Sequence, residues 1–87
     1  MGTKEVMFFI RNYMSQVFDD AVIELNIFYD IRTIQHKGIL KISYRDFKES
    51  FDILFDAYHI EKQIVDFCNG VVCYVKQAYL DYLRKEK

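Results

Sequence analysis

The chain has 87 residues with 12 basic and 13 acidic side chains, which gives a formal net charge of −1. Hydrophobic residues make up 52% and aromatic residues 17%, enough apolar surface to offset the conformational entropy of folding, which argues against intrinsic disorder. The balanced charge argues against a general attraction to nucleic acid or anionic membranes, and the length predicts one domain spanning residues 1–87.

Residues 4–18 are predicted to form a helix. Apolar side chains at Met7, Ile10 and Met14 recur on one face, and Thr3 is placed to cap the start. The two acids at 19–20 oppose the helix dipole at its C-terminal end, so we expect the helix to stop there.

Residues 23–44 are predicted to form a β-hairpin. Branched and aromatic side chains alternate along 23–33, the run 35–38 offers a turn in which Gly38 supplies a positive φ, and 39–44 forms the second strand. The isoleucines in this segment also fit helical spacing, so a helical alternative stays open.

Two further helices are expected after the hairpin. Ser43 is placed to begin one over residues 43–58, in which large apolar side chains recur every three or four positions. The last helix spans about 60–84, and Gly70 inside it suggests close packing by a neighbouring element.

The predicted fold is therefore α+β, in the order helix, β-hairpin, helix, helix. The alternative is an all-α bundle in which residues 4–35 form one or two helices. The hairpin has free edges, and pairing of these edges across a two-fold axis would give a homodimer.

The sequence shows no convincing catalytic or metal-binding set. We expect His36 in the turn and His59 at a helix junction to be structural, and Cys68 and Cys73 to be buried, unbonded apolar residues. The two cysteines do not have zinc spacing, and three isolated glycines cannot form a phosphate loop. We expect a non-enzymatic, cytoplasmic protein in a reducing compartment that uses no cofactor or metal and does not engage a membrane.

Four acids in the helix expected over residues 43–58 define the leading functional hypothesis. Their spacing of three, three and four would form an acidic ridge on a helix; they are Asp46, Glu49, Asp52 and Asp56. Such a ridge, with aromatic rings nearby, would dock on a protein with a basic groove. This predicts a small regulator or inhibitor, of the kind that phages and mobile elements encode against host nucleic-acid-handling proteins.

The alternative hypothesis is a nucleic-acid-binding accessory protein. Aromatic and basic side chains near the C-terminus would stack bases and hold phosphates; they are Tyr74, Tyr82, Arg84, Lys85 and Lys87. Its signature would be an affinity that falls steeply with salt concentration.

Overall fold

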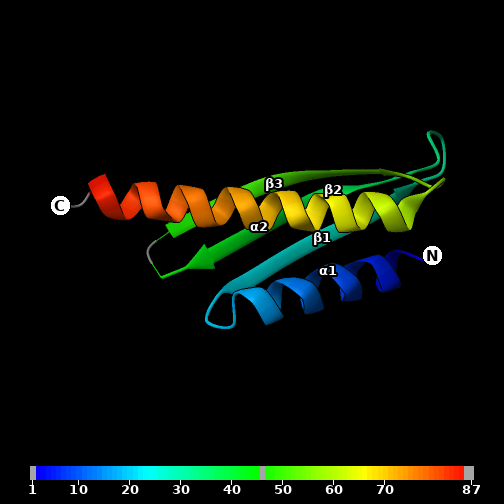
Figure 1. The fold of residues 1–87 in the computed structure, drawn as a ribbon. Coiled ribbons are helices and arrows are strands. Elements are labelled where there is room, and N and C mark those ends of the chain that lie inside the picture. The colour runs from blue at the N-terminus through cyan, green and yellow to red at the C-terminus, as the bar shows by residue number, and fades with distance from the viewer. Residues whose placement is uncertain (1, 46, 86–87) are drawn as a thin grey trace.

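A computed structural model describes residues 2–45 and 47–85 of the chain. Two helices flank three strands in the sequence (Figure 1). The elements are α1 (Thr3–Val17), β1 (Val22–Asp30), β2 (Gln35–Tyr44), β3 (Phe47–Asp56) and α2 (Ile60–Lys85). The strands form one antiparallel sheet in the order β1-β2-β3, so the predicted α+β class is confirmed and the all-helical alternative is wrong.

Both helices pack on the same face of the sheet. Along each strand the burial alternates, and the sheet's inner face carries side chains such as Leu25 of β1, Leu40 of β2 and Ile53 of β3. α1 contacts β1, α2 contacts β3, and the two helices contact each other. The fold thus has two layers, with the core between them.

The core is contributed by every element. Val6, Ile10 and Met14 on α1 are fully buried, and they belong to one core cluster with residues of the three strands and α2. The hydroxyl of Tyr13 donates a 2.7 Å hydrogen bond to Oδ1 of Asn69, which ties α1 to α2 at the edge of this layer. The predicted inner face of the first helix is therefore confirmed, with Ile10 and Met14 buried and Met7 packed against the core.

Aromatic rings hold α2 against β3. Phe47, Phe51 and Phe55 point toward the helix, and each ring meets a ring of α2 edge-on at centroid distances from 5.4 to 6.0 Å. Four strand residues span about 13 Å, and the seven or eight helical residues between successive rings of α2 span about 11–12 Å, so the rings come into register along the two elements. Much of the high aromatic content is therefore used in this contact.

The predicted second helix, over residues 43–58, is wrong. Residues 47–56 form β3, which pairs with β2 over its whole length, from Tyr44 opposite Phe47 to Gln35 opposite Asp56. The helix–hairpin–helix order is consistent with the structure, but the hairpin continues into a third strand where a helix was expected.

The predicted turn at 35–38 is also wrong. The chain turns at 31–34, where the Asp30 carboxylate accepts a 3.0 Å hydrogen bond from the Arg32 amide and Ile34 has a φ of 56°. Gly38 lies inside β2, opposite Ile27, and its φ is not positive. A Cβ at Gly38 would collide with the carbonyl oxygen of Asn26 and lie 2.9 Å from the Cα of Ile27, so this glycine permits a close approach of β1.

Three smaller expectations are also corrected. Gly2, not Thr3, holds the N-cap position of α1, and no side chain caps it. Gly70 is exposed, and a Cβ there would meet nothing within 4 Å, so no described element packs closely against it. Cys68 is buried as expected, whereas Cys73 is exposed; both thiols are free, and burial raises the pKa of Cys68 to about 11.

Candidate functional site

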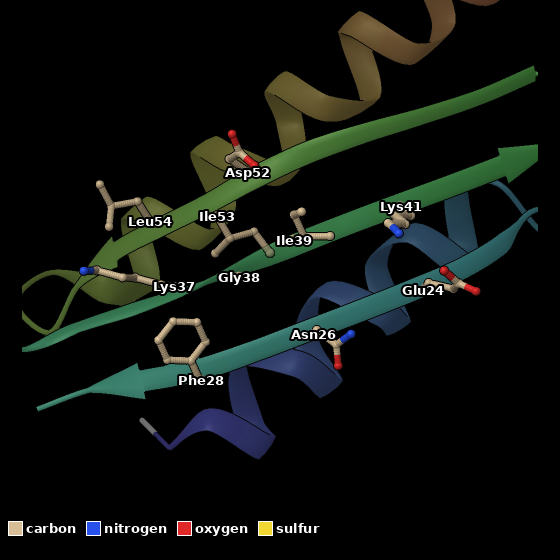
Figure 2. A pocket seen from close by; sticks show the side chains of 10 residues that line it. All are labelled: Glu24, Asn26, Phe28, Lys37, Gly38, Ile39, Lys41, Asp52, Ile53 and Leu54. Atoms are coloured by element: carbon tan, nitrogen blue, oxygen red, sulfur yellow. The ribbon is translucent and has the colours of Figure 1, made fainter.

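The sheet face that turns away from the helices forms a broad surface, here called the open face. Figure 2 looks onto this face, with both helices on the far side of the strands. Every second residue of each strand points outward there, and the central ones are Glu24, Asn26, Phe28, Lys37, Ile39, Lys41, Ser50, Asp52 and Leu54.

A shallow hollow of about 600 Å³ lies on the open face. Its apolar side chains occupy two adjacent cross-strand rows: Phe28 and Leu54 flank Lys37 in one row, and Ile39 lies at the centre of the next. Their exposed fractions are 59% for Phe28, 37% for Ile39 and 59% for Leu54. The hollow therefore has an apolar centre that is partly open to solvent.

Charged side chains surround this centre. Glu24 of β1 lies opposite Lys41 of β2, and Asp52 of β3 lies in the same row as Ile39 (Figure 2). An apolar centre with a polar rim is the usual composition of a surface that binds another protein.

One end of the open face is fixed by a polar network. Nζ of Lys37 donates a 3.0 Å hydrogen bond to the carboxylate of Asp30, and Nε2 of Gln35 donates a 2.9 Å bond to Asp56. The hydrogen bond from Lys37, followed by that from the Arg32 amide, lowers the pKa of Asp30 below its ordinary value. Lys37 itself lies between Phe28 and Leu54 in the sheet, and its amine reaches along the sheet to Asp30, which is opposite Gln35.

A second hollow of about 490 Å³, here called the β3–α2 groove, lies between β3 and α2. Its lining combines three acids with three aromatic rings and one glycine; these residues are Glu49, Asp52, Asp66, Phe51, Phe67, Tyr74 and Gly70. Asp52 lines both hollows, so the groove adjoins the open face at β3.

The four acids predicted to bind a partner do not form the expected ridge. On a strand, the spacing of three between Glu49 and Asp52 places them on opposite sides of the sheet. Asp56 follows Asp52 on the outer side, where it pairs with Gln35, and Asp46 lies outside the described residues. Glu49 and Asp52 both line the β3–α2 groove, Glu49 from the helix side of β3 and Asp52 from the side of the open face. Their role in partner binding stays a prediction.

The residues of the nucleic-acid hypothesis lie along the second half of α2. Tyr74 meets Phe51 at 5.5 Å and Tyr82 meets Phe47 at 6.0 Å, so both rings take part in holding α2 on β3. Arg84 lies 3.8 Å from the Asp81 carboxylate, Lys85 is exposed, and Lys87 lies outside the described residues. Nucleic-acid binding at this end of α2 stays a prediction.

The histidines have different environments. His36 is not in a turn but in β2, where it is 4% exposed and stacks at a tilt on Tyr29 with centroids 5.0 Å apart. Its Nδ1 is buried without a hydrogen-bond partner, and burial lowers its pKa. His59 is exposed at the junction before α2, as expected, and has a φ of 56°.

Within residues 2–45 and 47–85, no three histidine, cysteine or acidic side chains are grouped as metal ligands. In the same part of the chain, neither helix combines the length and the apolar character needed to cross a bilayer.

Sequence reasoning did not find the centre of the open face. Phe28 lies in the segment that the sequence predicts as a strand, and Leu54 lies in the segment 43–58 that it predicts as a helix; neither is among the predicted binding residues. The signal that would have found Leu54 is the alternation in 47–56, where Phe47, Phe51 and Phe55 share one side and Leu54 the other. No protein-family model matches the chain, and comparisons with curated proteins and with solved structures found no match.

Proposed function

We propose that this protein is a non-enzymatic regulator or inhibitor that binds another protein through the open face of its sheet. The observation that carries the proposal is the apolar cluster of Phe28, Ile39 and Leu54, which is exposed on the side of the sheet away from the helices.

The composition of this face supports the proposal. When one face of an antiparallel sheet packs on the core, the other is normally solvated and polar. Here two of the exposed apolar side chains, Phe28 and Leu54, are large, and they lie in the same cross-strand row. Contiguous apolar patches with a charged rim are typical of binding surfaces, because their burial against a partner releases water at little polar cost.

The rigidity of the face also supports it. The three strands pair without interruption over nine or ten residues, and two cross-strand hydrogen bonds, Lys37–Asp30 and Gln35–Asp56, tie the strands together at one end. A preorganised surface loses little conformational entropy on binding, so a larger share of the contact energy appears as affinity.

Affinity capture with matched variants tests the proposal. The double variant Phe28→Ser, Leu54→Ser removes the apolar cluster, and the control Phe8→Ser, Leu80→Ser removes two apolar side chains that are exposed on the helices, at 72% and 50%. Each tagged protein is incubated with an extract of the cells that produce it, and the retained proteins are quantified by mass spectrometry. We expect a protein that wild type and control retain equally and that the open-face variant loses at least about tenfold.

The opposite result is equally clear. If the open-face variant retains the same proteins as wild type, the open face is not the binding surface and the proposal fails. Circular dichroism of each variant confirms that the fold is intact before the comparison is made.

A further inference from the structure

The β3–α2 groove carries unneutralised negative charge. Glu49, Asp52 and Asp66 line it, none of the three forms an ion pair with a described residue, and its lining includes no lysine, arginine or histidine. Acidic residues that line one hollow attract a positively charged group and disfavour a negative one.

Aromatic rings give the same groove a second means of holding a cation. Phe51 and Tyr74 meet edge-on at 5.5 Å with planes at 88°, and Tyr74 remains 52% exposed. Arginine and lysine side chains bind to ring faces through cation–π attraction while their aliphatic stems pack on apolar surface. The combination of acids and rings therefore fits a basic side chain better than an apolar one.

Gly70 is an independent indication that the groove is used. It lies in the middle of α2 between Asp66 and Tyr74, where glycine lowers helix stability relative to alanine. A Cβ at this position would meet no atom of a described neighbour within 4 Å, so no internal packing accounts for the glycine. The space over Gly70 is free for a group from outside the molecule.

The adjacent strand offers a docking edge. β3 is an outer strand of the sheet, so the backbone groups along its outer edge have no strand partner among the described residues. An extended segment that pairs with this edge would lie about 4.8 Å from β3, and every second side chain would point toward the α2 side. That is the side on which the β3–α2 groove lies.

We propose that the β3–α2 groove receives an arginine or lysine side chain from an extended segment of another protein, which pairs with the outer edge of β3. This inference rests on the proposed protein-binding function, and it adds the chemistry and conformation of the bound segment. The open face and the groove adjoin at Asp52, so one partner could occupy both.

Peptide titration tests this inference without the natural partner. The probe is a capped five-residue peptide with a central arginine between valine and threonine residues, and the matched peptides carry glutamate or norleucine at the centre. Binding to ¹⁵N-labelled protein is followed by amide chemical shifts. We expect saturable shifts centred on Ser50, Asp66 and Gly70 with the arginine peptide, and an affinity at least about tenfold weaker with either matched peptide.

A variant pair locates the site. Gly70→Leu fills the groove while favouring the helix, and Gln77→Leu places the same side chain at another exposed position of α2. We expect Gly70→Leu to weaken binding of the arginine peptide at least about tenfold and Gln77→Leu to leave it unchanged.

The inference is overturned if the three peptides bind equally, if none binds, or if Gly70→Leu binds the arginine peptide as wild type does. The open-face variant Phe28→Ser, Leu54→Ser should bind this peptide normally. Failure of the peptide test therefore leaves the proposal for the open face standing, and failure of the capture test leaves the groove inference to be judged by the peptide.

Discussion

His36 is the one buried titratable side chain that the described structure leaves without a partner at a ring nitrogen. Nδ1 accepts no hydrogen bond, and the imidazole lies between Tyr29 and the core. Protonation would place a positive charge on the ring away from water and without a counter-charge. Burial therefore lowers the pKa of His36 below 6.5.

Stability should therefore fall as the pH drops below 6.5. The unfolded chain binds a proton at His36 near its ordinary pKa, while the folded protein resists it, so protonation favours unfolding. The contribution of neutral His36 to the free energy of unfolding is complete above pH 6.5 and is lost progressively toward lower pH. We expect the urea midpoint to fall between pH 7 and pH 5.5, a window above the ordinary pKa of the carboxylates.

Two variants isolate this effect. His36→Leu should abolish most of the pH dependence in that window, because no imidazole remains to be protonated. His59→Asn is the control, because it replaces an exposed histidine at a positive φ that asparagine tolerates. This variant should keep the pH dependence of the wild type. A His36→Leu protein with the same pH profile as wild type would contradict the assignment.

Gly38 shows how one residue sets the geometry of two strands. Its backbone approaches Asn26 and Ile27 so closely that any side chain would have to displace β1. Replacing it should disturb the β1–β2 pairing itself and not only local packing, because the obstacle is backbone.

We expect Gly38→Ala to lower the free energy of unfolding by about 1–3 kcal/mol, the cost of overpacking a well-packed site. Gly70→Ala is the matched control, because its Cβ would enter open space, and it should raise that free energy by about 0.5–1 kcal/mol. Urea unfolding measures both. Equal effects at the two glycines would show that backbone entropy, and not the contact with β1, governs Gly38.

The two helices that the sequence predicted correctly have a clear helical period. α1 and α2 are long and amphipathic. The prediction of β1 rested on its alternating branched and aromatic side chains, although its isoleucines also fit helical spacing. β3 was mistaken because Phe47, Phe51 and Phe55 recur every four residues. That spacing puts side chains on one side of a helix and equally on one side of a strand, since four is a multiple of two.

The turn between β1 and β2 was predicted at the wrong residues for a related reason. Glycine is the commonest residue at positive φ, so Gly38 was a natural choice, but Ile34 occupies that conformation instead. The sequence signal for the actual turn was Asp30, because aspartate favours turns in which its carboxylate accepts a hydrogen bond from the amide two residues later. In the structure that amide belongs to Arg32.

The candidate site could be predicted only in fragments. Asp52 and Glu49 were named from the sequence, but their neighbours in the two hollows come from other elements: Phe28 from β1, Ile39 from β2 and Asp66 from α2. Which residues meet across a sheet depends on strand register, and a misassigned β3 removes the register altogether.

The two-layer arrangement separates stability from the proposed function. Burial between the sheet and the helices stabilises the fold, whereas the open face has no second layer among the described residues, so its apolar side chains gain little on folding. Neighbouring residues on β3 should therefore differ sharply in energetic role according to the side they face.

Ile53 and Leu54 provide the direct comparison, because they are adjacent in β3 with exposed fractions of 3% and 59%. We expect Ile53→Ala to lower the free energy of unfolding by about 2–5 kcal/mol, through lost burial and a residual cavity, and Leu54→Ala by less than about 1 kcal/mol. Urea unfolding at several protein concentrations measures both variants. If Leu54→Ala costs as much as Ile53→Ala, and wild-type stability rises with concentration, the open face is covered by a second copy in the free protein. The homodimer suggested by the sequence would then involve this face, and an external partner would have to displace that copy.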